Sequence, residues 1–110
     1  TEGALLAKMG DRGQLGNVIV DGPLSLDVAL FKEVAEHKKV KGSSVAGDPD
    51  CLLFPNIESA NVFFKSTTHL CGGELAAMVM GTKVPCVLTS RGDSSKTKLY
   101  SIALACLAAK

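Results

Sequence analysis

Apolar and polar positions follow two different patterns along this chain. Short unbroken apolar runs, such as residues 18–20 and 51–54, are typical of strands that are buried on both faces. Longer segments between them carry apolar residues three or four positions apart, which is the period of an amphipathic helix. In chain order the pattern predicts helix 1–12, strand 17–21, helix 25–39, strand 50–54, helix 57–70, strand 75–80, strand 84–89 and helix 94–109.

The alternation of helices with such strands predicts an α/β fold, with a three-layer arrangement in which helices cover both faces of a sheet. One connection departs from a purely parallel arrangement. Only residues 81–83 join strand 75–80 to strand 84–89, whereas a parallel crossover needs a dozen or more residues. These two strands must pair antiparallel or lie apart, so we expect a mixed sheet.

Composition narrows the class of protein. The chain has 110 residues, of which 46% are hydrophobic and 21% are charged, as expected for a globular domain of ordinary size. A net charge of +1 gives no electrostatic reason to expect a nucleic acid or a membrane surface as partner. No apolar run approaches the ~20 residues that span a bilayer.

The cysteines indicate the compartment. They lie in apolar runs without C-x-x-C spacing, which predicts buried free thiols, a cytoplasmic location and no metal site. The four positions are Cys51, Cys71, Cys86 and Cys106.

The loop 89–96 is the most informative polar segment, because it opens the last predicted helix. A helix start exposes unpaired N–H groups and the positive end of the macrodipole, and acidic residues are usual there. Here the first turn holds Lys96 and Lys98, with Arg91 just upstream and only Asp93 in partial compensation. Such a cluster of cations predicts an anion site, most simply for phosphate.

A plainer interpretation of the same loop is a helix cap. Ser94 or Asp93 would then be the N-cap residue, and the lysines would extend into water. These residues alone leave both interpretations open.

A second polar segment enters the helix predicted at 57–70. Asn56 suits the N-cap and Glu58 suits the first turn, so capping is sufficient to explain both. Asn61 is a mediocre helix former in mid-helix and is not explained in this way. It shares a helix face with Glu58 and Lys65, and the carboxyl end of a strand in an open α/β sheet is where ligands usually bind. We therefore predict a substrate-binding face here.

Four motifs, in chain order, resemble those of the phosphate acetyl/butyryl transferases. They are DGPLSLD at 21–27, VAGDPD at 45–50, PNIExxN at 55–61 and TSRGDS at 89–94. The resemblance extends from about Leu5 to Ala109, and residues 93–105 are most similar to the phosphate butyryltransferase branch.

This resemblance implies an enzyme that moves an acyl group, butyryl or similar, between coenzyme A and inorganic phosphate. Coenzyme A would be a substrate, with no tightly bound cofactor. The implied fold is similar to that of isocitrate and isopropylmalate dehydrogenases, with two α/β domains around a cleft, usually in a homodimer. Residues 1–110 would be the C-terminal portion, without the N-terminal domain, and inactive alone because half of the cleft is missing.

The resemblance also assigns roles by position. Ser90 matches the active-site serine, Arg91 matches the adjacent arginine that holds phosphate, and Asp93 is the nearest carboxylate. Thr97 stands where the acetyl branch has an aspartate proposed as general base, and His69 stands where that branch has an arginine. We predict Ser90, Arg91 and Asp93 as catalytic residues. The predicted substrate-binding residues are Asn56, Glu58, Asn61, Ser94 and Lys96.

Two alternatives to a butyryl-transferring enzyme remain open at this point. One is transfer of acetyl instead of butyryl. The other is a non-catalytic module of the same fold that binds an anion or mediates assembly.

Overall fold

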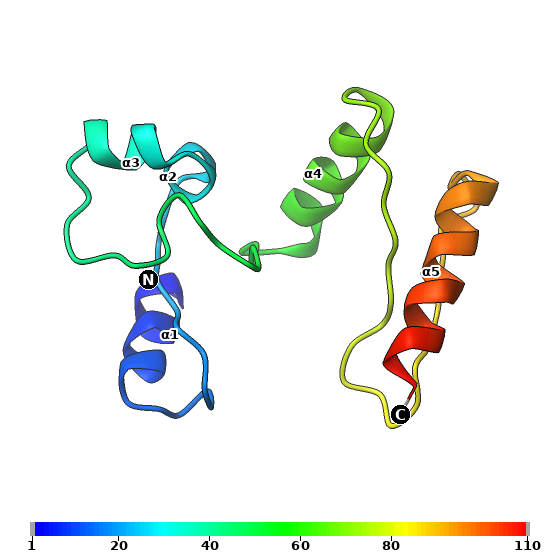
Figure 1. The fold of residues 1–110 in the computed structure, drawn as a ribbon, viewed down its shortest axis with the longest axis horizontal. Helices are drawn as coiled ribbons and strands as arrows, with labels where there is room; N and C mark the ends of the chain where they lie inside the picture. Colours follow the sequence, from blue (N-terminus) through cyan, green and yellow to red (C-terminus); the bar gives the residue numbers. More distant parts are fainter. Residues whose placement is uncertain (1, 110) are drawn as a thin grey trace. The chain divides into compact units, whose positions relative to one another are not determined.

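The computed structural model describes residues 2–109, in which helices are joined by long irregular segments (Figure 1). The helices are α1 (Glu2–Asp11), α2 (Leu26–Leu30), α3 (Lys32–His37), α4 (Ile57–His69) and α5 (Ser95–Ala108). The chain forms two compact units, residues 1–59 and residues 60–110, called here the N-terminal and C-terminal units. Helix α4 begins in the first and continues in the second.

Helical periodicity predicted the helices well. The segments expected at 1–12, 57–70 and 94–109 correspond to α1, α4 and α5. The single helix expected at 25–39 is wrong, because Phe31 has extended backbone angles (φ −121°, ψ 114°) and separates α2 from α3. The Phe31 N–H donates to the Asp27 carbonyl at 2.9 Å and so ends α2, while its own carbonyl accepts from Val34 and Ala35 and starts α3.

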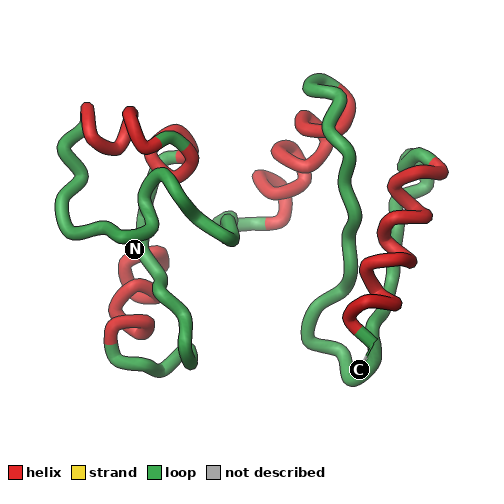
Figure 2. The backbone as a smooth tube through the Cα atoms, viewed as in Figure 1, coloured by secondary structure: helices red, strands yellow, loops and turns green. Residues whose placement is uncertain are grey.

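The predicted sheet is absent from residues 2–109, and Figure 2 shows helices and loops there without a strand. The described backbone has one isolated antiparallel bridge, in which the Val79 N–H donates to the Cys86 carbonyl at 2.9 Å. Gly81, with φ at +87°, supplies the left-handed conformation in the turn between them. The α/β prediction of a three-layer mixed sheet with helices on both faces is therefore wrong for this structure.

The reason lies in what an apolar run can indicate. Such a run shows that a segment favours burial, but it does not identify the backbone that would pair with it. A strand needs a neighbouring backbone about 4.8 Å away with aligned N–H and C=O groups. Side chains in the predicted strands instead remain open to solvent: Ile19 is 75%, Leu53 79% and Leu88 81% exposed.

The core of the N-terminal unit is small and lies on α2 and α3. Its buried apolar residues are Val28, Ala29 and Ala35. The loop that follows α3 returns to this core, where the Gly47 N–H donates to the Ala29 carbonyl at 2.9 Å. A Cβ at Gly47 would lie 2.5 Å from the Lys32 Cα, so this close approach requires glycine.

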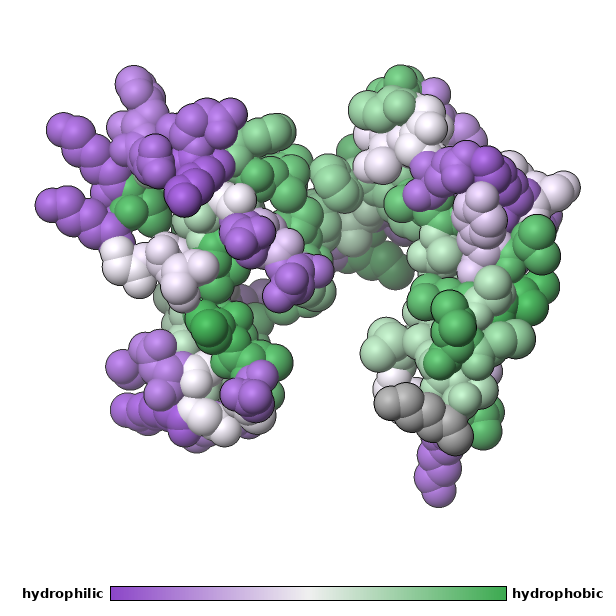
Figure 3. Space-filling model, viewed as in Figure 1, coloured by the Kyte–Doolittle hydropathy of each residue, from purple (hydrophilic) through white to green (hydrophobic). Residues whose placement is uncertain are grey.

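The C-terminal unit is held differently, through polar groups on α5. Ser101 is fully buried and Thr97 is 8% exposed. Apolar residues instead gather on the surface over the C-terminal half of α5, shown in green in Figure 3, where Ile102, Leu104 and Leu107 are all exposed. None of the helices in residues 2–109 is both long and apolar enough to cross a membrane.

Candidate functional site

The start of α5 is built on a serine cap. Ser94 has extended backbone angles, and its Oγ accepts from the Thr97 N–H at 3.1 Å. The hydroxyl groups of Ser94 and Thr97 also lie 3.1 Å apart. The cap interpretation of Ser94 is therefore confirmed, and Thr97 belongs to the cap because both its N–H and its hydroxyl contact Ser94.

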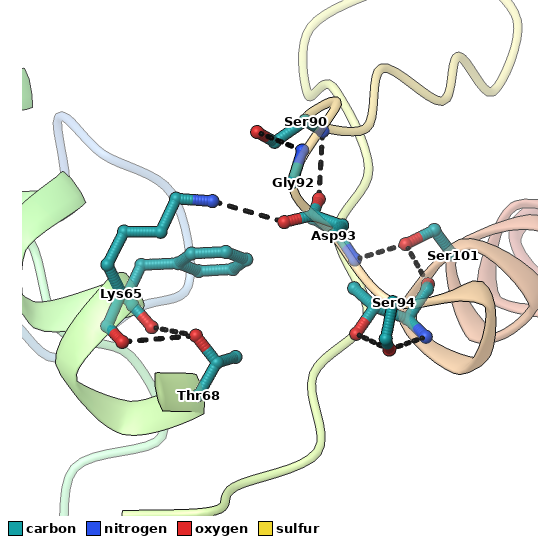
Figure 4. Close-up of polar contacts among 10 residues, drawn as sticks. Lys65, Thr68, Ser90, Gly92, Asp93, Ser94 and Ser101 are labelled. Atoms are coloured by element: carbon teal, nitrogen blue, oxygen red, sulfur yellow. Dashed lines mark hydrogen bonds and ion pairs between the residues drawn. The ribbon is translucent and has the colours of Figure 1, made fainter. Parts of the chain in front are cut away.

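The turn before this cap is closed by Asp93 (Figure 4). Asp93 Oδ2 accepts from the Ser90 N–H at 2.8 Å, and the Asp93 N–H donates to the Ser90 carbonyl at 3.1 Å. The second carboxylate oxygen, Oδ1, accepts from Lys65 Nζ at 3.1 Å. Lys65 belongs to α4, so the ion pair joins the loop to a second helix of the same unit.

The environment of Asp93 favours its charged form. Its side chain is only 9% exposed, and burial by itself would raise the pKa of the carboxyl. Hydrogen bonds from the Ser90 N–H and from Lys65, with the positive charges of Lys65 and Lys98, outweigh burial and lower the pKa of Asp93 below its usual value. The carboxylate is therefore ionised near neutral pH and is a weak proton acceptor.

Ser90 and Arg91 are at the outer side of the same turn, and both are exposed. The Gly92 N–H donates to Ser90 Oγ at 3.3 Å, which leaves the hydroxyl proton of Ser90 available to donate. Among residues 2–109, no side chain forms a hydrogen bond or ion pair with the Arg91 guanidinium. The turn thus presents one hydroxyl donor and one guanidinium to solvent at the positive end of α5.

Lys96, in the first turn of α5, has a partner that the local sequence did not reveal. Its Nζ forms an ion pair with Glu74, and both side chains are exposed. The same Nζ lies 5.6 Å from the centre of the Tyr100 ring. The hydrogen bond between the two side chains raises the pKa of Lys96 and lowers the pKa of Glu74. Part of the positive cluster predicted at the helix start is therefore compensated.

Ser101 fixes the segment before the loop to α5. Its Oγ donates to the Thr97 carbonyl at 2.7 Å and accepts from the Ala77 N–H at 3.0 Å. A fully buried hydroxyl that makes both bonds has no unsatisfied group. These contacts tie Ala77 to Ser101, one turn after Thr97, which completes the Ser94 cap.

The predicted residues at the start of α4 have simpler surroundings. Asn56 Oδ1 accepts from the Ser59 N–H at 2.8 Å, and Ser59 Oγ donates to the Asn56 carbonyl at 3.0 Å, so Asn56 caps α4. Glu58 and Asn61 are exposed, and within residues 2–109 no hydrogen bond or ion pair involves their side chains. Asn56 and Glu58 belong to the N-terminal unit, whereas Asn61 belongs to the C-terminal unit with the loop.

The structure therefore brings together Ser90, Asp93 and Ser94, with Arg91 on the same turn. It adds Lys65, which shares a helix face with Asn61 but is not among the residues predicted for the site. The sequence feature that could have indicated Lys65 is a lysine within the apolar period of α4, and its partner Asp93 lies 28 positions later. Local spacing could not show that pairing.

The structure also bears on metals and thiols. Within residues 2–109 no three His, Cys, Asp or Glu side chains come close enough to hold a metal ion. All four cysteines are free, as predicted. The prediction that they are buried is wrong: Cys51, Cys71 and Cys106 are exposed, and Cys86 is partly buried.

Comparison with known proteins gives one consistent result. A family model described as "Phosphate acetyl/butaryl transferase" matches residues 6–106. A phosphate butyryltransferase of Clostridium beijerinckii is 52% identical over 98% of this chain and 35% of its own length. A phosphate acetyltransferase of Thermotoga maritima is 48% identical over 94% of this chain and 35% of its own length.

A solved structure agrees with these sequences. The crystal structure of a branched-chain phosphotransacylase from Enterococcus faecalis V583 superposes with a TM-score of 0.74 at 37% identity, and the match covers 94% of this chain and 39% of that one. The chain thus spans about a third of the length of the curated relatives it matches.

Proposed function

The chain belongs to the phosphate acetyl/butyryl transferase family, and from this we propose that it takes part in transferring a short-chain acyl group between coenzyme A and inorganic phosphate. The observation that carries the proposal is the 52% identity, over 98% of the chain, to a phosphate butyryltransferase. We propose butyryl or a similar acyl group as the one transferred. Coenzyme A is then a substrate, and the complete enzyme works as a homodimer without a tightly bound cofactor.

The reaction has a simple balance. A phosphate oxygen attacks the thioester carbonyl carbon, a C–O bond forms, and the carbonyl oxygen gains negative charge. Collapse of this intermediate breaks the C–S bond, so that the products are acyl phosphate and the thiol of coenzyme A after it takes a proton. A thiol pKa of ~8.5 makes the thiolate a good leaving group, so the demand on a proton donor is modest.

The loop suits two steps of this reaction. The free hydroxyl proton of Ser90 can donate to the developing oxyanion, where a placed donor stabilises the transition state. The guanidinium of Arg91 has the planar fork that binds two oxygens of one phosphate. The unpaired N–H groups at the start of α5 add further donors for an anion.

The remaining predicted site residues fall into two groups, those whose side chains form no hydrogen bond or ion pair in the described part of the chain and those whose side chains already do. Glu58 and Asn61 are exposed, so they can contact substrate without losing a bond, and we propose them for binding coenzyme A. Ser94 and Asn56 already cap helices, and Lys96 already pairs with Glu74. Any contact that these three make with substrate would add to an existing structural role.

The test is an assay of the full-length protein with butyryl-, isobutyryl- and acetyl-coenzyme A, following the release of free thiol with and without phosphate. We expect phosphate-dependent release, fastest with a four-carbon acyl group. Fastest release with acetyl-coenzyme A would instead support a phosphate acetyltransferase, as the 48% identity to the Thermotoga enzyme allows. No release with any of the three would overturn the proposal and support a non-catalytic module.

A further inference from the structure

The ion pair between Lys65 and Asp93 serves no step of the reaction described above. Lys65 lies two turns into α4, and its Nζ lies over the Phe64 ring, 5.0 Å from the ring centre. From there it reaches the loop and bonds Asp93 Oδ1 at 3.1 Å. The lysine side chain is 40% exposed and the aspartate side chain 9%, so the pair is shielded on one side only.

Asp93 itself is fully engaged by this arrangement. One carboxylate oxygen bonds Lys65, and the other bonds the Ser90 N–H at 2.8 Å. The carboxylate therefore connects an α4 side chain to the backbone of the residue whose hydroxyl faces solvent. A group that is ionised and bonded at both oxygens is better suited to hold the turn than to accept a proton.

The contacts also leave few ways for the turn to move. Residues 90 and 93 are joined twice, by the Asp93 carboxylate and by the Asp93 N–H to Ser90 carbonyl bond at 3.1 Å. The C-terminal side of the turn is fixed by the Ser94 cap. The Lys65 contact is the one link among the described residues from the Asp93 side chain to a second helix, so it ties the turn to α4.

We propose that Lys65 is a positioning residue, which acts through Asp93 to hold Ser90 and Arg91 in place for acyl transfer. This inference rests on the proposed function. It also changes the role predicted for Asp93, from a catalytic group to the link between Lys65 and the turn. Small displacements of groups that orient substrates can lower rates by up to ~100-fold.

The experiment compares four single variants and one double variant of the full-length enzyme with wild type. Lys65→Met removes the charge and keeps an unbranched side chain, whereas Lys65→Arg keeps a cation of similar reach. Asp93→Asn keeps an oxygen for the Ser90 N–H and weakens the bond to Lys65. Lys83→Met is the matched control, because Lys83 is exposed and has no ion pair among residues 2–109.

We expect Lys65→Met and Asp93→Asn each to lower kcat by about 10-fold, with a smaller change in the KM for acyl-coenzyme A. Lys65→Arg should recover most of the loss, and Lys83→Met should match wild type. The Lys65→Met/Asp93→Asn double variant should lose no more than the worse single variant, because both remove one interaction. The pH profile of kcat/KM should keep its shape in every variant.

Three results would overturn the inference while the proposed function stands. They are a Lys65→Met variant as active as Lys83→Met, losses that multiply in the double variant, and an Asp93→Asn variant that alone loses the acidic limb of the pH profile. An inactive wild-type enzyme would overturn the proposed function and this inference with it. Thermal unfolding of each variant confirms folding, and Lys65→Gln replaces Lys65→Met if the latter does not fold.

Discussion

Helices α4 and α5 each begin with one polar side chain that caps the first turn, but only the start of α5 carries a second set of contacts. At α4, Asn56 Oδ1 accepts from the Ser59 N–H at 2.8 Å. At α5, Ser94 Oγ accepts from the Thr97 N–H at 3.1 Å, and Asp93 then closes the preceding turn onto Ser90 and Lys65. Capping needs only one side chain. The start of α5 has additional contacts through Asp93 and still exposes the Ser90 hydroxyl and the Arg91 guanidinium, so these two groups are available to bind a ligand.

Among the variants that test this difference between the two helix starts, removing the hydroxyl of Ser90 should have the largest effect on kcat. We expect Ser90→Ala to lower kcat by about 100-fold, because loss of one oxyanion donor costs ~10²–10³ in rate. Steady-state kinetics with butyryl-coenzyme A and phosphate measure the effect. Ser95→Ala, on the first turn of α5, is the control and should retain wild-type kcat; equal rates in both variants would show that Ser90 is no more than a turn residue.

Changing the guanidinium of Arg91 should have the next largest effect. Arg91→Lys keeps the charge but loses the fork, so kcat/KM for phosphate should fall by at least ~10-fold, or ~1.4 kcal/mol of transition-state stabilisation. The matched control is Arg12→Lys, an exposed arginine of the N-terminal unit. Wild-type kinetics for Arg91→Lys would identify Arg91 as an ordinary surface charge.

The two caps allow a direct comparison of stability. Asn56→Ala and Ser94→Ala should each lower the free energy of unfolding by about 1 kcal/mol, the usual cost of losing an N-cap. Urea unfolding of the full-length protein measures this loss.

Kinetics of the same two variants separate capping from binding. Only Ser94→Ala should also lower kcat, because Ser94 adjoins the turn that presents Ser90. A raised KM for acyl-coenzyme A in Asn56→Ala would show that Asn56 binds substrate as well as capping α4.

The smallest effect concerns pH. The pKa of Asp93 is lowered in the folded protein, so its contribution to stability is complete above its unfolded pKa, ~3.9, and is lost as pH falls through the folded value. Thermal unfolding between about pH 5 and pH 2 should therefore show a steeper loss of stability for wild type than for Asp93→Asn. Parallel curves for the two proteins would show that the contacts of ionised Asp93 with Ser90 and Lys65 do not contribute to stability.

Asp27 provides a comparison for this pH effect in the other unit. The hydrogen bond from Lys38, followed by that from Ser25, lowers the pKa of Asp27 to about 2. Asp27→Asn should also flatten the acid limb of the stability curve, but without changing kcat. Comparing Asp93→Asn with Asp27→Asn thus distinguishes an acid-sensitive contact at the candidate site from an acid-sensitive contact far from the site in the sequence.

Much of the local structure could be predicted from the sequence. The periodic segments correspond to α1, α4 and α5, and the motif at 89–94 lies at the start of α5 as expected. The Asn56 and Ser94 caps also follow from residue type and position. Each of these features depends on residues within about four positions of one another, where the pattern carries the information directly.

The predictions that were wrong depend instead on residues far apart in the sequence. The predicted strands at 17–21, 50–54, 75–80 and 84–89 needed partners that no local pattern identifies. The helix predicted at 25–39 is interrupted at Phe31. An apolar side chain can be satisfied by any apolar neighbour, whereas a strand needs one aligned backbone.

The sequence by itself determined the helices α1, α4 and α5, the caps of two helices, and the family that the motifs resemble. Tertiary structure alone decided the partners of the charged side chains: Lys65 meets Asp93 across 28 positions, and Lys96 meets Glu74 across 22. Hydrogen bonds of a helix and its cap close within one turn of chain, so residue type suffices to predict them. An ion pair between distant segments depends on the path of the chain between them, and that path is set by the packing of the whole unit.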